Sequence, residues 1–506
     1  MMQIDHTTLP LSTFRVMEAT SSSSQDARTS SSTHESLPQP PPAPKEAWVD
    51  IEEMISKATA RFETQISTKV TRIYKFPRHL RGMGGPDGRY IVPSVVAIGP
   101  YHHGRPHLQE MEEVKKVAAH QFCRYCGCSV EEVYEKIVSV AGDARRCYTV
   151  DDDTSLVATL GDTEFTTMMF LDGCFLLQLM VNYQEPPIIG RINSSGPNIC
   201  KDIFMLENQI PWLVIEVLME FFIRPVNLVK AFLIPLMGET LLGREEATLW
   251  STRFQRSLLT LQAFLMKCRH RVKRDTPTND ESDISNEDPK PPHLLGLLWF
   301  TVTLGMPSQR RRGDNTYIMS QLLSKSSSAV YLAQIGIKLS ASRAAWFADM
   351  AVREKPFCGE LSLSPLLLDG TAACWLVNLA ALEAAEATNA SSVQSDGHVV
   401  ISYISMMAML MDREEDVQEL RAKGVLSSRF SNAETLDFFK GLAQHMRRGF
   451  NYHTVMRDIN EYMSKRPVRI AVYSFVYKYR RLIVAVMSIA SVLVGIFKAL
   501  YSLKKP

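Results

Sequence analysis

The stretch that most constrains this chain runs from Ile199 to Phe222, where two apolar runs are joined by a polar break. The break is Glu207-Asn208-Gln209, and Pro211 follows it closely. Because proline lacks a backbone N–H and disfavours helical geometry in the residue before it, a helix arriving from Asp202 must stop or bend there. A second helix can begin at the proline, and the polar side chains are the nearest partners for the backbone groups at both helix ends. The sequence therefore predicts a buried polar cluster between two core helices.

Two further helical segments carry a charged residue on an apolar face. The segment from Leu108 to Arg124 places Lys115 there, and the segment from Asp162 to Tyr183 places Asp172 there. Each charge stands at helical spacing from large apolar side chains, so it should point into the same packed surface as they do. An unpaired buried carboxylate is costly, and Asp172 is therefore predicted to pair with Lys115 or with Arg145.

Polar residues on apolar stripes belong either to a structural network in the core or to an active site. We favour a network, whose predicted members are Arg145, Asp172, Glu207, Asn208 and Gln209. The alternative is an enzyme, for instance a hydrolase, in which Glu112, Lys115 and Asp172 carry out general acid–base chemistry in a cleft. The sequence contains no Gly-x-Ser-x-Gly elbow, P-loop, dinucleotide fingerprint or His-Glu-x-x-His helix, so it assigns no catalytic residue.

Histidines and cysteines cluster without the spacing of a known metal site. His102, His103 and His107 could offer imidazoles to zinc or another transition metal, but two adjacent histidines in an extended segment point opposite ways. The run Cys123-Arg-Tyr-Cys126-Gly-Cys128 holds one C-x-x-C with no second pair at zinc-ribbon distance. The sequence predicts turn histidines and reduced thiols here, and it assigns no metal and no cofactor.

The overall charge argues against nucleic acid as a partner. Lysine and arginine number 56 against 54 aspartates and glutamates, a balance that gives no general attraction to a polyanion. The nine cysteines are an odd number, which favours free thiols over a disulfide framework. The first 30 residues show no basic start followed by an apolar run, so we expect no secretory signal and a cytosolic location for the bulk of the chain.

The chain divides into three parts by composition. Residues 1–45 are rich in serine and proline and predict a disordered tail. Residues 46–465 predict a mainly α-helical globular domain, with a small antiparallel β meander between Ala333 and Leu368. Within this domain, exposed loops are expected at 276–292 and 308–315, the second carrying Arg310-Arg-Arg312. Residues 466–506 predict a juxtamembrane segment and a transmembrane helix.

The C-terminal segment is long enough to cross a bilayer once. Leu482 to Phe497 carries no charge, and the segment extended to Leu503 is about 33 Å long as a helix. Tyrosines (Tyr473, Tyr477, Tyr479) and basic residues (Lys478, Arg480, Arg481) precede it, as is typical of a membrane interface. The expected partner of this segment is the membrane. The alternative is a buried C-terminal helix.

The order of motifs resembles one family, the plant proteins grouped as domain of unknown function 247. The resemblance covers about residues 70–503 and is carried by Ile98-Gly-Pro-Tyr-His-His-Gly104, Ala144-Arg145 with Cys147-Tyr148, Leu171-Asp-Gly-Cys-Phe175, Leu206-Glu-Asn-Gln-Ile-Pro211, His293-Leu-Leu295, the Gly336 region and Asn378-Leu-Ala-Ala-Leu-Glu383. Phe76-Pro77 stands where the family usually has Val-Pro. Membership implies a mostly helical, usually membrane-associated plant protein of unestablished activity, and some members are implicated as pollen-side determinants of self-incompatibility in grasses.

These observations predict a membrane-anchored module for protein interaction, recognition or signalling, with an unknown protein partner. The rival prediction is the enzyme with the Glu112, Lys115 and Asp172 set. The two differ in whether a cleft reaches those side chains.

Overall fold

A computed structural model describes the chain over residues 73–85, 87–149, 156–181, 188–222, 232–233, 236–237, 291–303, 327–342, 347–389 and 398–503. Three predictions lie outside these residues: the disordered tail at residues 1–45, nearly all of the exposed loop at 276–292, and the loop at 308–315 with Arg310-Arg-Arg312.

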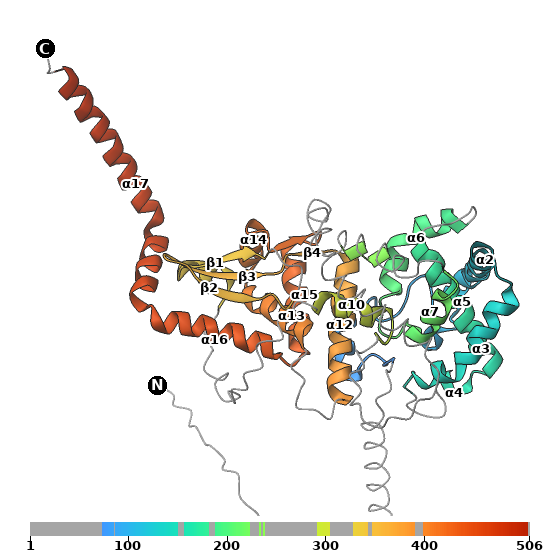
Figure 1. Ribbon diagram of the computed structural model, residues 1–506. Coiled ribbons are helices and arrows are strands. Elements are labelled where there is room, and N and C mark those ends of the chain that lie inside the picture. Colours follow the sequence, from blue (N-terminus) through green and yellow to red (C-terminus); the bar gives the residue numbers. More distant parts are fainter. Residues whose placement is uncertain are drawn as a thin grey trace, which may run out of the picture. The chain divides into compact units, whose positions relative to one another are not determined.

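Helices dominate the described residues, so the predicted mainly α fold is confirmed (Figure 1). The N-terminal part contains the short 3-10 helices η1 (Arg78–Gly84), η2 (Pro100–His102) and η3 (Pro106–Leu108), followed by α2 (Gln109–Cys126), α3 (Val130–Arg146), α4 (Leu156–Thr159), α5 (Asp162–Val181), α6 (Ile188–Asp202) and α7 (Trp212–Met219). The later part contains α10 (Leu294–Thr303), α11 (Ala329–Gln334), β1 (Ile337–Ala341), β2 (Ala351–Glu354), β3 (Gly359–Leu363), β4 (Leu366–Leu368), α12 (Gly370–Asn389), α13 (Val399–Leu410), α14 (Glu414–Ala422), β5 (Leu426–Ser428), α15 (Asn432–Gln444), α16 (Phe450–Lys465) and α17 (Pro467–Leu503).

Helix α5 lies at the centre of the N-terminal part. It packs against α2, α3 and α7, and its apolar residues are buried on almost every side of the helix. By length and composition α5 could cross a membrane, but most of it is covered by its neighbours. It is therefore a core helix, and its burial explains why a charge on it needs a partner.

The small sheet differs from the predicted antiparallel meander. Its strand order is β1-β3-β2, with β1 parallel and β2 antiparallel to β3. The alternating residues of β3 are mostly buried on both faces, whereas β2 is half-exposed. A strand with that burial belongs in the middle of a sheet, which places β3 between the other two. Strands β4 and β5 form a separate parallel pair.

The polar break also differs from the prediction in one respect. Helix α6 ends at Asp202 itself, and residues 203–211 form turns and irregular backbone instead of continuing the helix toward Pro211. The amide groups of Asn208 and Gln209 bind the carbonyls of Asp202, Ile203 and Met205, so these side chains replace the helical hydrogen bonds. Helix α7 begins at Trp212, immediately after Pro211.

Helix α17 is one continuous helix whose apolar stretch is exposed (Figure 1). Its length and composition make it a candidate membrane span. Its first turns contact the folded domain: Tyr473 Oη donates to the Phe357 carbonyl at 3.1 Å, and the Tyr473 ring lies against Gly336. Gly336 has a φ of +84°, and a Cβ there would meet the tyrosine ring, so glycine is required at this contact.

Candidate functional site

The charged residues of α2 and α5 form a buried triad. Lys115 Nζ lies 2.6 Å from Asp172 Oδ1 and 2.6 Å from Glu112 Oε1. The Lys115 side chain is 0% exposed, that of Asp172 1% and that of Glu112 18%. Asp172 Oδ2 also accepts the Gly99 N–H at 2.7 Å. The structure therefore brings together the three residues of the enzyme hypothesis and seals two of them inside the protein.

The environment of Lys115 favours its charged form. Burial disfavours the charge, but the carboxylates of Asp172 and Glu112 outweigh that cost and raise the lysine pKa above its ordinary value. A lysine with a raised pKa holds its proton at neutral pH and is a poor general base. The triad is arranged as an ion-paired cluster that keeps one cation between two carboxylates.

Arg145 is not the partner of Asp172. Its guanidinium donates to the carbonyls of Val157 and Leu160 at 2.6 and 3.0 Å and lies 4.3 Å from the centre of the Phe165 ring. It thereby ties the end of α3 to the segment that leads into α5. The five donors of an arginine suit this role, because they can satisfy several carbonyls at once.

The polar break joins several segments that are distant in sequence. Glu207 Oε1 accepts the Phe76 N–H at 2.8 Å and lies 3.3 Å from the Arg81 guanidinium. Asn208 Oδ1 accepts the Ile98 N–H at 2.6 Å, while its amide nitrogen donates to the carbonyls of Val96 and Asp202 at 3.0 Å each.

Gln209 completes the cluster on its other side. Its amide nitrogen donates to the carbonyls of Ile203 and Met205, and its oxygen accepts the Leu295 N–H at 3.0 Å. These side chains are buried and hydrogen-bonded on every side, as structural polar groups in a core must be.

Residues 98 and 99 connect the break to the charged triad. Ile98 donates to Asn208, and Gly99 donates to Asp172. Gly99 has a φ of +76°, and a Cβ there would collide with the Gln209 carbonyl. The network is therefore continuous from α2 to α10, and it passes through a position that only glycine can occupy without strain.

Three other buried polar residues were not predicted as members of the network. Asp202 accepts the N–H groups of Ser94, Val95 and Val96 at 2.6 to 3.1 Å. Asn378 accepts the Leu206 N–H. Glu383 accepts N–H groups at the start of α13 and the Trp299 indole N–H, while burial raises its pKa to about 8. Asn378 and Glu383 could have been predicted from the sequence, because each is a polar residue in a highly apolar helix.

His102 and His107 make separate contacts, and His103 Nδ1 is buried without a hydrogen-bond partner among the described residues. His102 is buried with its Nε2 3.5 Å from Glu207 Oε2, a long approach for a hydrogen bond. Burial, with Arg105 adding to it, lowers the pKa of His102 to about 3. His107 Nε2 lies 3.2 Å from the Pro93 carbonyl. Across the described parts of the chain, no group of three or more His, Cys, Asp or Glu side chains is placed to hold a metal ion.

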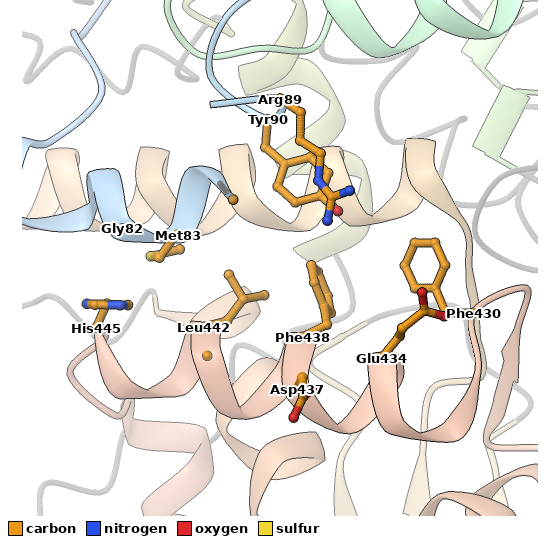
Figure 2. A pocket seen from close by; sticks show the side chains of 12 residues that line it. Gly82, Met83, Arg89, Tyr90, Phe430, Glu434, Asp437, Phe438, Leu442 and His445 are labelled. Carbon is orange, nitrogen blue, oxygen red and sulfur yellow. The ribbon is translucent and has the colours of Figure 1, made fainter. Parts of the chain in front are cut away.

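A surface groove of about 340 Å³ lies between η1 and α15, and no residue of the triad or of the polar break lines it. Figure 2 shows Arg89 and Tyr90 on one side and Glu434, Phe438 and Leu442 of α15 on the other. The Arg89 guanidinium lies over the Tyr90 ring at 4.9 Å, and the Tyr90 and Phe438 rings meet edge to face at 6.3 Å. Gly441 also lines the groove, and a Cβ added there would meet open space.

Comparison with known proteins gives a family match and two curated relatives. Residues 73–496 match a family described as DUF247, plant protein of unknown function. The chain is 26% identical to UPF0481 protein At3g47200 of Arabidopsis thaliana over 74% of each chain. It is 31% identical to putative UPF0481 protein At3g02645 of the same plant, over 31% of this chain and 29% of the relative. No solved structure matches the chain.

Proposed function

Because the chain belongs to the DUF247 family of plant proteins of unknown function, we propose its role from its own surfaces: a membrane-anchored module that binds a protein partner. The observation that carries the proposal is α17, a helix with an exposed apolar stretch long enough to cross a bilayer. A soluble protein rarely leaves so large an apolar surface uncovered. Lys478, Arg480 and Arg481 stand immediately before the apolar stretch, where basic residues are typical of a membrane interface.

The groove between η1 and α15 supports partner binding. Its walls carry arginine, tyrosine, phenylalanine and methionine, the residue types enriched at protein interfaces. Arg89 is exposed and already held over Tyr90, so less side-chain entropy is lost when a partner binds it. We assign the groove, defined by Arg89, Tyr90, Phe438 and Gly441, as the partner-binding surface.

The enzyme alternative has less support from the geometry. Lys115 and Asp172 are closed off from solvent, and the groove is lined by neither of them nor by Glu112. General acid–base groups must reach a substrate. We therefore propose that the triad stabilises the fold.

The first test removes the anchor. Deleting residues 482–506 should move the protein from the membrane fraction to the soluble fraction, because the deleted helix supplies the exposed apolar surface. The truncated protein should keep the thermal unfolding transition of the parent, since the apolar stretch does not pack into the core. A truncated protein that still sediments with carbonate-washed membranes, or that aggregates, would contradict the anchor.

The second test fills the groove. Gly441→Leu places a side chain in open space on α15 and should abolish labelling of the partner in proximity-labelling experiments in the native tissue. Gly142→Leu is the matched control, because Gly142 is a helical glycine of α3 that lies outside the groove, and a Cβ there would come no nearer than 4.0 Å to the flexible Arg146 side chain. Equal labelling by both variants would reject the groove. Proteins whose labelling is lost with Gly441→Leu but kept with Gly142→Leu would identify the partner. Proteins of pollen self-incompatibility among them would support a signalling role.

A further inference from the structure

Helix α17 begins with a stem, Pro467–Arg481, that is too long for the membrane interface alone. The stem is about 22 Å long at about 1.5 Å per residue. The headgroup layer of one leaflet is about 5 to 8 Å thick, so it covers the stem back to about Tyr477 if Leu482 marks the hydrocarbon boundary. On that placement, which rests on the proposed membrane anchor, Val468, Val472 and Phe475 lie in water.

One face of the stem is fastened to the folded domain. Arg469 donates to the Pro356 carbonyl at 3.0 Å and Tyr473 to the Phe357 carbonyl at 3.1 Å, and Ser474 Oγ lies 3.5 Å from the Gln334 carbonyl. Ile470 packs against the core. These residues share one side of the helix, since they are spaced one, three or four apart.

The opposite face of the stem is apolar and exposed. Val468 is 77% exposed, Val472 56%, Phe475 59% and Tyr479 37%. At 3.6 residues per turn this face points about 160° away from the side that contacts the domain. Within the described residues, nothing covers it.

The exposed face continues as a regular seam through the apolar stretch. From Val468 the seam advances in alternating steps of four and three, through Val472, Phe475, Tyr479, Leu482, Val486, Ile489 and Leu493 to Ile496. No member is charged, and Arg469, Lys478, Arg480, Arg481 and Lys498 all lie off it. The repeat is more informative in the stem than in the apolar stretch, because the stem carries polar residues on its other sides. A repeat of seven residues with apolar first and fourth positions is typical of helices that wind around each other.

We infer that two copies of this chain pair through the α17 seam as parallel helices. The occupant of the seam must be apolar both in water and in the bilayer, must repeat every seven residues, and must enter the membrane in the same direction. A second copy meets all of these conditions. The seam faces away from the folded domain, so each copy can keep its own domain contacts in the pair. The positively charged side chains next to the seam oppose pairing only weakly. Salt in the solvent screens the repulsion between exposed charges of the same sign.

The test uses full-length protein reconstituted in lipid vesicles. Val472→Cys and Phe475→Cys should each form a disulfide-linked dimer under Cu(II)–phenanthroline, above the level given by the native cysteines. Arg481→Cys, on the far side of the same stem, should not exceed that level. The double variant Val472→Glu, Phe475→Glu should raise the dimer dissociation constant by more than about tenfold, since charge at seam positions is strongly disfavoured. Single-molecule photobleaching would then change from two steps to one.

The outcomes separate this inference from the anchor. Protein that remains in the vesicles but bleaches in one step before any substitution would overturn the pairing and leave the anchor standing. Equal cross-linking at Val472 and Arg481 would do the same, by showing random collision. If the Glu variant loses vesicle binding while the parent is monomeric, lipid covers the stem face and the inference is wrong. A parent that fails to enter the vesicles would contradict the anchor itself.

Discussion

Asp172→Ala is expected to lower the free energy of unfolding by about 3 to 5 kcal/mol. The substitution leaves the fully buried Lys115 with Glu112 as its remaining carboxylate, and it removes the acceptor of the buried Gly99 N–H. Total stabilities are commonly about 5 to 15 kcal/mol, so the variant should express poorly and unfold at a markedly lower temperature. Circular dichroism of the detergent-solubilised full chain measures the loss.

A double-mutant cycle identifies the cause. Asp172→Asn keeps the shape and can still accept the Gly99 N–H, while Lys115→Met removes the cation with little change of volume. If the two residues pair as the 2.6 Å contact indicates, the double variant should be less destabilised than the sum of the single variants, by about 1 to 3 kcal/mol. Strict additivity would show that the pair contributes nothing. A folded Asp172→Ala variant with normal stability that loses a measurable activity would restore the enzyme hypothesis.

The buried triad shows which part of the site the sequence could predict. Helical periodicity identified Lys115 and Asp172 as inward-facing, because a face is a local property of one helix. It could not choose between Lys115 and Arg145 as partner, since that depends on how α2 and α3 pack around α5. The structure places Lys115 there and directs Arg145 to the carbonyls of Val157 and Leu160.

The fold differs from the prediction for the same reason: sequence patterns describe single elements, whereas these differences depend on tertiary packing. The strands of the small sheet follow from their alternating residues, but the parallel pairing of β1 with β3 depends on how the connection between them is routed. At the end of α6, the Asp202 carboxylate accepts the N–H groups of residues 94–96, a contact between distant segments that the sequence does not reveal. The groove was missed for a related reason. Its two sides, near residues 89 and 438, are brought together only by the tertiary structure.

Asn208→Ala is expected to be as damaging as the loss of Asp172, for a different reason. The side chain makes three buried hydrogen bonds, to the Ile98 N–H and to the carbonyls of Val96 and Asp202. Alanine leaves the Ile98 N–H and the Val96 carbonyl unpaired, whereas the Asp202 carbonyl keeps its bond from the Met205 N–H. Each buried unpaired group costs about 1 to 3 kcal/mol. A small cavity adds to that cost unless water enters and binds the exposed groups. We therefore expect a loss of about 2 to 6 kcal/mol in unfolding free energy.

Asn208→Asp distinguishes the hydrogen bonds from the packing. Aspartate has nearly the same size and keeps the acceptor for Ile98, but it loses the two donors and brings a carboxylate toward two carbonyl oxygens. If the donors matter, this variant should unfold at a lower temperature than the parent at neutral pH and recover part of the loss at acidic pH, where the carboxyl is protonated and can donate once. The direction follows because burial among carbonyls raises the folded-state pKa of an acid, so its destabilisation grows as pH rises. A variant as stable as the parent at neutral pH would show that Asn208 fills space and does not hold the break together. In that case residues 96–98 must be held to α6 chiefly by Asp202, whose carboxylate accepts the N–H groups of residues 94–96.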